Sequence, residues 1–263
     1  MHTTSMSSDP VFVLSAGART GSTLVQRLIT STRDALVWGE HDGQVLALLD
    51  AMERALRQCH DRGGARQFQA FLESGPQAWI ANMVPAPDDV RRGLRAFLEA
   101  AFGAPAAALG YRRWGFKEIR YGAAQALYLQ GLYPDARFVF VVRRPADCLR
   151  SYMGVPWYDH RPDAFLARWV ALATELDDVR GSLRHAVLVR FEDLAATPDP
   201  VIERIAATIG VAPSSVDRGV LSHLVRGAHA APVMLGSAEA ALVEAPAIAA
   251  AAARFGYRSG HSG

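Results

Sequence analysis

This sequence of 263 residues has few cysteines, a small net charge and no long apolar run. The two cysteines, Cys59 and Cys148, are too few for a disulfide framework and are not spaced as metal ligands. A formal net charge of +2 creates no whole-protein field that would attract nucleic acid or a membrane surface, so any anion site must be local. We therefore expect a protein of a reducing compartment, without a metal and without a nucleic-acid partner.

The sequence also lacks the signals of secretion and membrane insertion. Its first ten residues are polar and have neither the basic start nor the apolar centre of a signal peptide. Glu244, Pro246 and Arg254 interrupt the Ala-rich stretch near the end, and no apolar run approaches the ~20 residues of a membrane span. These features predict a cytoplasmic protein with no membrane partner.

The length and composition indicate one domain. With 50% hydrophobic and 21% charged residues, the chain is long enough for one sizeable core and short for two. We expect a single domain over residues 1–263, with a helical insertion over residues 65–110 and a frayed tail over residues 258–263. The aromatic residues of the insertion are typical of a core, although a lid that excludes water from an acceptor site has the same pattern.

A strand, a turn and a helix follow one another near the N-terminus. Val11–Leu14 is a short apolar run that fits a strand buried on both faces of a parallel sheet, and apolar residues recur at helical spacing from Ser22 onward. Gly17 and Gly21 permit a sharp turn and close backbone approach. Because the free N–H groups at a helix N-terminus attract anions, this turn is a candidate phosphate loop.

The turn lacks the lysine of a nucleoside-triphosphate loop. That loop reads G-x-x-x-x-G-K-[ST], where the lysine reaches the phosphates and the hydroxyl holds magnesium. Here Gly17 and Gly21 are one residue closer together, Ser22 stands in place of the lysine, and Arg19 lies inside the loop. The pattern argues against ordinary MgATP chemistry. The alternative to a phosphate loop is a purely structural turn, in which the two glycines only allow the chain to bend.

A second candidate strand, over residues 34–38, is followed by polar side chains. Glu40 and His41 follow it after Gly39. In open α/β sheets, ligands bind at the carboxyl ends of the strands, and either residue can act as a base there. The alternative is a polar cluster that caps the next helix.

Residues 112–119 predict a further strand with a cation at its end. Lys117 occupies that end, where it could stabilise charge on a leaving group. A surface ion pair with Glu118 or Asp135 is the alternative.

The apolar run Arg137–Val142 predicts a parallel strand inside the sheet. It ends in Arg143, and Pro145 opens a helix two residues later. A guanidinium beside a helix N-terminus is a second candidate phosphate site. Two such sites in this order make a purely structural interpretation of both turns much weaker.

These motifs resemble those of sulfotransferases that use 3′-phosphoadenosine 5′-phosphosulfate (PAPS). Their 5′-phosphosulfate loop commonly reads R-S-G-[ST]-[ST]-L, and residues 19–24 match it with Thr20 in place of the serine. Their 3′-phosphate motif commonly reads R-[DN]-P-x-[DE]-x-x-x-S. It is matched by Arg143, Pro145, Asp147 and Ser151, while Arg144 departs from it.

The resemblance extends from Val11 to about Gly210 and implies both a fold and a reaction. The implied fold is α/β: a P-loop-type parallel sheet flanked by helices, with the helical insertion over the carboxyl-terminal edge of the sheet. The implied reaction moves the sulfuryl group from PAPS to a hydroxyl of a small-molecule acceptor and leaves adenosine 3′,5′-bisphosphate. No metal takes part.

The resemblance also implies roles for individual residues. The nucleotide-binding residues would be Gly17, Ala18, Arg19, Thr20, Gly21, Ser22, Thr23, Arg143 and Ser151. The segments WGEHD and WGFKE resemble the carboxylate-dependent members, which implies that Glu40 is the catalytic base. His41 is the alternative base, and Lys117 with Arg19 would stabilise the leaving phosphate.

Two other functions stay open. A P-loop small-molecule kinase would need a lysine in place of Ser22 and a magnesium-binding aspartate. A non-catalytic sensor of 3′-phosphoadenosine nucleotides would need the binding residues but neither Glu40 nor Lys117.

A late arginine closes over the nucleotide in some relatives, and Arg226 is either its counterpart or an ordinary surface arginine. Phe191 replaces a tyrosine of the family and removes a hydroxyl that could meet the nucleotide. The acceptor and the oligomeric state are not legible in the sequence.

Overall fold

The computed structural model describes residues 9–222 and 233–257. It divides into two compact units, of which one comprises Met1–Glu40 with Ala106–Gly263 and the other comprises His41–Pro105. We call them the sheet unit and the helical unit. In the part of the chain that is described, no helix is both long and apolar enough to cross a bilayer.

The sheet unit is built on five parallel strands in the order β2-β3-β1-β4-β5. The strands are β1 (Val11–Ser15), β2 (Ala35–Trp38), β3 (Arg113–Glu118), β4 (Arg137–Val142) and β5 (His185–Arg190). Every residue of β1 and β3 is buried, as expected for strands covered on both faces. The sheet with flanking helices confirms the predicted α/β fold of P-loop type.

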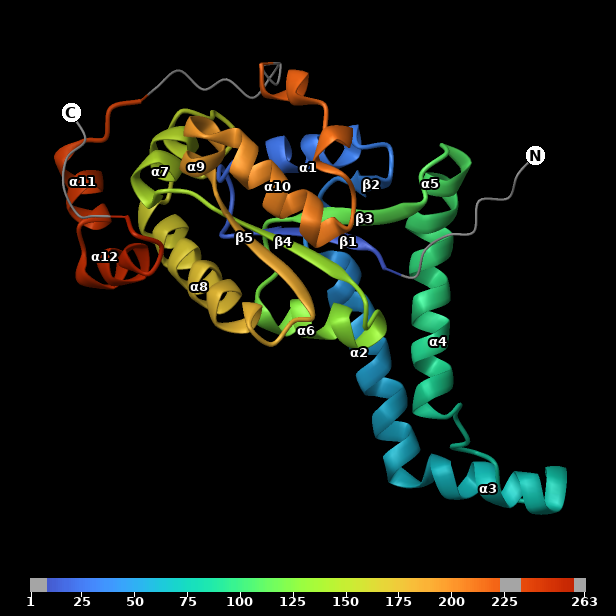
Figure 1. The fold of residues 1–263 in the computed structure, drawn as a ribbon. Coiled ribbons are helices and arrows are strands. Elements are labelled where there is room, and N and C mark those ends of the chain that lie inside the picture. The colour runs from blue at the N-terminus through green and yellow to red at the C-terminus, as the bar shows by residue number, and fades with distance from the viewer. Residues whose placement is uncertain (1–8, 223–232, 258–263) are drawn as a thin grey trace. The chain divides into compact units, whose positions relative to one another are not determined.

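The helices of the sheet unit cover both faces of the sheet (Figure 1). They are α1 (Ser22–Ser31), α6 (Ala123–Leu132), α7 (Pro145–Met153), α8 (Pro162–Arg180), α9 (Phe191–Ala196), α10 (Pro198–Ile209), α11 (Ser237–Val243) and α12 (Pro246–Ala253), with short 3₁₀ turns at Pro213–Ser215 and Arg218–Leu221. Helices α1 and α10 lie on one side of the strands, and α6 and α8 lie on the other.

The two faces of the sheet bury different kinds of side chain, because successive residues of a strand point to opposite faces. Val11 and Val13 of β1 belong to an aliphatic core with α1 and α10. Phe12 faces the other way, and its ring centroid lies 4.7 Å from that of Phe116 in β3 and 5.7 Å from that of Phe138 in β4. At the central strand β1 both faces of the sheet are therefore closed to water, which leaves the strand ends for polar chemistry.

The helical unit contains three main helices: α2 (Gln44–Cys59), α3 (Ala65–Ser74) and α4 (Pro87–Leu98). Single turns follow α2 at His60–Gly64 and α3 at Gly75–Gln77. A third turn, at Glu99–Gly103, leads from α4 into α5 (Ala104–Ala108), in which the chain passes from the helical unit to the sheet unit. Gly63 has φ 123°, which accounts for the kink between α2 and α3. The buried Glu53 of α2 accepts hydrogen bonds from Arg57 at 2.8 Å and from Arg91 of α4 at 3.0 Å. We expected a helical insertion over residues 65–110, whereas the helical unit already begins at His41.

Candidate active site

The loop between β1 and α1 alternates its backbone handedness. Gly17, Arg19 and Gly21 have φ values of 84°, 65° and 86°, and the residues between them are not in the left-handed region. Such alternation turns neighbouring N–H groups toward one point and forms an anion-binding nest. Arginine in this region costs roughly 1–3 kcal/mol, so contacts around Arg19 must hold it there.

Those contacts come from the second predicted phosphate motif. The Nε of Arg19 donates a hydrogen bond to the Oγ of Ser151 at 2.8 Å, although 132 residues separate the two. The Nη1 of Arg143 donates to the backbone carbonyl of Arg19 at 3.2 Å. The 5′-phosphosulfate motif and the 3′-phosphate motif, which lie far apart in the sequence, are therefore in contact at Arg19.

Arg143 is held from two other sides. The indole Nε1 of Trp169 in α8 donates to its backbone carbonyl at 3.1 Å. Its guanidinium carbon lies 4.6 Å from the centre of the Phe191 ring, in a cation–π contact. Phe191 also borders Gly21, where an added Cβ would come within 2.2 Å of the ring. The sequence indicated only a missing hydroxyl at Phe191, whereas its ring packs between the two phosphate motifs.

Glu40 and Lys117 lie at the ends of the neighbouring strands β2 and β3. The Nζ of Lys117 forms an ion pair with Glu40 Oε1. Arg120 contacts the other oxygen of Glu40 at 3.2 Å and also Glu118 at 3.2 Å. Lys117 is the only lysine among the 28 basic residues of the chain, and its side chain is 7% exposed. The predicted base and the predicted cation therefore pair with each other, and Arg120 is a third member that the sequence analysis missed.

One cavity of roughly 220 Å³ collects most of these residues. We call it the phosphate cavity. Its predicted lining residues are Ala18, Arg19, Gly21, Ser22, Thr23, Glu40, Lys117, Arg143 and Ser151, and Leu24, Ile119 and Tyr158 complete the wall. Three of the predicted side chains that line it are cations and one is an anion. An excess of positive charge in a cavity beside an anion nest favours a ligand with several negative charges.

The other predicted site residues lie elsewhere. Gly17 lines a neighbouring cavity, and the buried Thr20 directs its hydroxyl to the Gly17 carbonyl at 3.5 Å. His41 belongs to the helical unit, where its ring centroid is 6.2 Å from that of Phe102. Arg226 lies outside the described residues.

Cys148 lies under the loop, with its Sγ 3.7 Å from the carbonyl of Arg19. Burial raises the pKa of its thiol far above the ordinary value, because a thiolate would lose its hydration there. The thiol therefore stays protonated and is a packing group rather than a nucleophile. Within residues 9–222 and 233–257, no group of three or more His, Cys, Asp or Glu side chains is arranged to hold a metal ion.

Comparison with known proteins identifies the family. The family model described as "Sulfotransferase family" matches residues 10–214, so the chain belongs to the sulfotransferase family. Nodulation protein NoeE of Sinorhizobium fredii (strain NBRC 101917 / NGR234) is 34% identical over a match that covers 46% of this chain and 34% of that protein. The matched region is therefore about a third of the length of this relative.

Solved structures share the fold. The sulfotransferase domain from the Synechococcus PCC 7002 olefin synthase has a TM-score of 0.53 and 16% identity, covering 99% of this chain and 98% of that one. The sulfotransferase domain from the curacin biosynthetic pathway has a TM-score of 0.52 and 15% identity, covering 97% of this chain and 100% of that one. These similarities extend over almost the whole chain and concern the fold alone.

Proposed function

We propose that this chain is a PAPS-dependent sulfotransferase that transfers the sulfuryl group to a hydroxyl of a small-molecule acceptor without a metal. The observation that carries the proposal is the phosphate cavity itself. Residues of two phosphate motifs, together with Glu40 and Lys117, line that one cavity. Membership of the sulfotransferase family supports the transferase class.

The nucleotide would be held at both of its phosphate ends. The nest around Arg19 and the N-terminus of α1 would bind the 5′-phosphosulfate. Arg143 and Ser151 would bind the 3′-phosphate. The Nη1 of Arg143 donates a hydrogen bond to the carbonyl of Arg19 in the loop, which holds the guanidinium beside it. A guanidinium packed on an aromatic ring, as Arg143 is on Phe191, keeps its orientation for this task.

Glu40 would accept the proton of the acceptor hydroxyl, and His41 is the alternative base. In the reaction, the acceptor oxygen forms a bond to sulfur while the bond from sulfur to the 5′-phosphate oxygen breaks. Lys117 and Arg19 would stabilise the negative charge that grows on that oxygen. A sulfuryl group carries less negative charge than a terminal phosphoryl group, so fixed cations can take the place of magnesium.

Thermal unfolding with adenosine 3′,5′-bisphosphate in EDTA, compared with MgADP, tests the proposal. Ligand at ~100 times its dissociation constant stabilises the folded state by ~2.7 kcal/mol, which raises the Tm by several degrees. We expect only the 3′-phosphorylated nucleotide to raise the Tm. A shift with MgADP alone would instead favour a small-molecule kinase, and binding without PAPS turnover on any hydroxyl acceptor would favour a sensor.

A further inference from the structure

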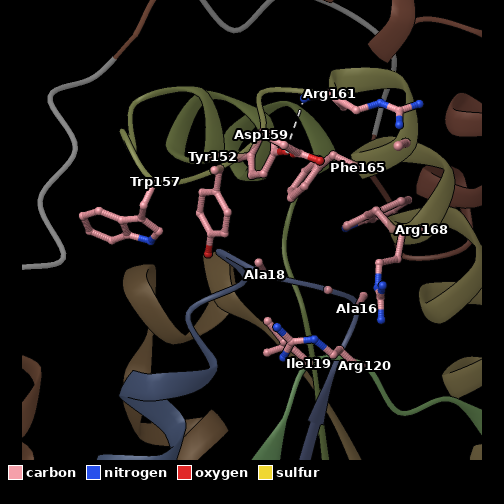
Figure 2. A pocket seen from close by; sticks show the side chains of 14 residues that line it. Ala16, Ala18, Ile119, Arg120, Tyr152, Trp157, Asp159, Arg161, Phe165 and Arg168 are labelled. Carbon is pink, nitrogen blue, oxygen red and sulfur yellow. Dashed lines mark hydrogen bonds between the residues drawn. The ribbon is translucent and has the colours of Figure 1, made fainter. Parts of the chain in front are cut away.

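A second cavity, of roughly 450 Å³, lies beside the phosphate loop in the sheet unit (Figure 2). We call it the aromatic cavity. It shares Ala18, Ile119 and Tyr158 with the phosphate cavity, so the two spaces adjoin. Arg120 lines it and also contacts Glu40. A molecule in the aromatic cavity therefore lies next to the proposed base, and the volume suits a small organic ligand.

One wall of this cavity is a stack of aromatic rings from α7, α8 and their connection. The ring of Tyr152 is stacked on that of Phe165 with centroids 4.4 Å apart, and it lies 4.7 Å from the ring of Tyr158. Trp157 follows at 6.4 Å from Tyr158 and is 70% exposed. Rings already fixed by stacking offer a flat ligand a large contact area at little cost in conformational entropy.

The charged side chains of the cavity are three arginines and one aspartate. The carboxylate of Asp159 accepts a hydrogen bond from the hydroxyl of Tyr152, and Arg120 is paired with Glu40 and Glu118. Arg161 lies 3.9 Å from a carboxylate oxygen of Asp163. The cavity therefore has a surplus of positive charge after its own pairs are formed.

Arg168 carries that surplus. Within residues 9–222 and 233–257 its guanidinium has no hydrogen bond or ion pair. Figure 2 shows Arg168 directed toward Ala16 and the side where Arg120 lies, whereas Arg161 extends away from the centre of the cavity. A guanidinium with free donors in the wall of an aromatic cavity is suited to a carboxylate or another oxyanion.

We propose that the acceptor is an aromatic hydroxyl compound that carries an anionic group. Its ring packs against Tyr152 and the neighbouring rings, its anion is bound by Arg168, and its hydroxyl reaches Glu40. This inference rests on the proposed function, because the hydroxyl is assigned only by the sulfuryl transfer. The charge preference is assigned to Arg168 and can be measured without turnover.

The test compares two probes of nearly equal shape, 3-(4-hydroxyphenyl)propionate and the corresponding amide. Each is titrated calorimetrically into the enzyme saturated with adenosine 3′,5′-bisphosphate. We expect the carboxylate to bind at least about tenfold more tightly than the amide, because a charge-assisted hydrogen bond is worth more than a neutral one. The preference should disappear in Arg168→Gln. It should persist in Arg180→Gln, a control on the same helix whose guanidinium pairs with Asp177.

Three results would overturn the inference: no binding of either probe, equal binding of both, or an unchanged preference in Arg168→Gln. The nucleotide titration in the same samples keeps this failure apart from failure of the proposed function. If adenosine 3′,5′-bisphosphate does not bind, the proposed function fails, and the two probes are then compared on the enzyme alone. An unchanged affinity of Arg168→Gln for the nucleotide establishes that the variant is folded.

Discussion

Glu40 and Lys117 form an ion pair across 77 residues of sequence, at the carboxyl ends of two adjacent strands. The register of the sheet explains the contact, because Trp38 in β2 lies opposite Phe116 in β3, and Glu40 follows Trp38 by two residues while Lys117 follows Phe116 by one. The sheet itself therefore brings the proposed base and the proposed cation together.

Replacing the proposed base should remove turnover and leave nucleotide binding intact. In Glu40→Gln we expect the kcat to fall by about 10²–10⁴, since the amide cannot accept the hydroxyl proton. The affinity for adenosine 3′,5′-bisphosphate should stay within a factor of about two, because Glu40 carries the wrong charge to hold a phosphate. His41→Gln is the matched control. Normal turnover in Glu40→Gln together with a large loss in His41→Gln would transfer the role to His41.

The single lysine allows a clean test of the proposed cation. Lys117→Met should lower the kcat by about 10² or more, because the leaving phosphate loses a nearby positive charge. Lys117→Arg keeps the charge but changes its geometry and should recover only part of the loss. Steady-state kinetics with PAPS give both values. If Lys117→Met lost only PAPS affinity with the kcat unchanged, the lysine would serve binding alone.

Phe191 should matter for the 3′-phosphate through Arg143. In Phe191→Leu the side chain still fills the space beside Gly21, but the ring under the guanidinium is lost. We expect the affinity for adenosine 3′,5′-bisphosphate to fall by roughly two- to fivefold, as a cation–π contact is worth about 0.5–1 kcal/mol. Calorimetry should give no loss of affinity for Phe191→Tyr, which keeps the ring. An equal loss of affinity for ADP would mean that the loop as a whole has moved.

The two cysteines should differ in reactivity. Cys59 is exposed, whereas burial raises the pKa of the Cys148 thiol. Because the thiolate is the reactive form, iodoacetamide should alkylate the exposed Cys59 and leave Cys148 unmodified even at about pH 9. Mass spectrometry after iodoacetamide treatment should find one modified thiol in the native protein and two in the unfolded one. Rapid native modification of Cys148 would show that the segment under the loop opens.

The elements that could be predicted from the sequence are those with local signals. Val11–Leu14 and Arg137–Val142 are apolar runs and became the buried strands β1 and β4. The loop glycines were recognisable because Gly17 and Gly21 both have positive φ, which glycine adopts most readily. The family motifs predicted that Arg143 and Ser151 belong to one site, and both residues line the phosphate cavity.

What the sequence could not supply are contacts between distant segments. The sequence left two roles open for Lys117, a catalytic cation or one half of a surface ion pair with Glu118 or Asp135. It did not indicate the ion pair with Glu40 that the structure has. No spacing along the chain indicates that the Phe191 ring reaches Gly21. Likewise, the ion pair of Glu53 with Arg91 joins α2 to α4, so the helical unit starts well before the aromatic-rich stretch that suggested it.

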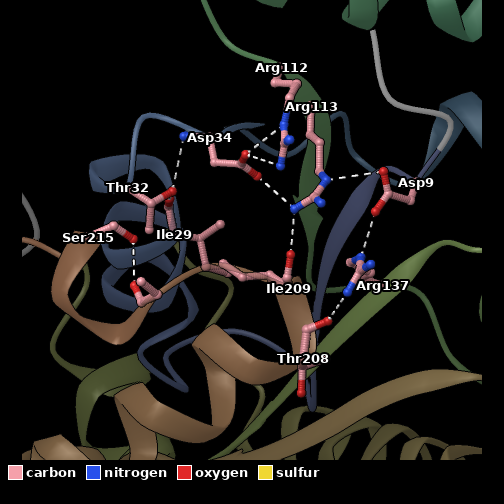
Figure 3. A network of polar contacts seen from close by, with 11 residues as sticks. Asp9, Ile29, Thr32, Asp34, Arg112, Arg113, Arg137, Thr208, Ile209 and Ser215 are labelled. Atoms are coloured by element: carbon pink, nitrogen blue, oxygen red, sulfur yellow. Dashed lines mark hydrogen bonds and ion pairs between the residues drawn. The ribbon is translucent and has the colours of Figure 1, made fainter.

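The amino ends of the strands, at the opposite end of the sheet from the phosphate cavity, carry a buried ion-pair network (Figure 3). Arg113, at the start of β3, contacts Asp9 at 3.1 Å and Asp34 at 2.7 Å, and its side chain is 7% exposed. Asp9 also contacts Arg137 at the start of β4 at 2.7 Å. Because Asp34 directly precedes β2, the network ties the four neighbouring strands β2, β3, β1 and β4 together at their amino ends, away from the phosphate cavity.

This location predicts a variant that loses stability and keeps activity. Arg113→Met leaves buried carboxylates with fewer partners, and we expect the free energy of unfolding to fall by about 3 kcal/mol, the lower end for a broken buried pair, since Arg137 and Arg112 still contact them. Urea denaturation measures the loss, and kcat at moderate temperature should be unchanged. Arg112→Gln is the control, because Arg112 is 50% exposed and a surface pair is worth less than about 1 kcal/mol. An equal cost for both substitutions would mean that burial does not set the strength of this network.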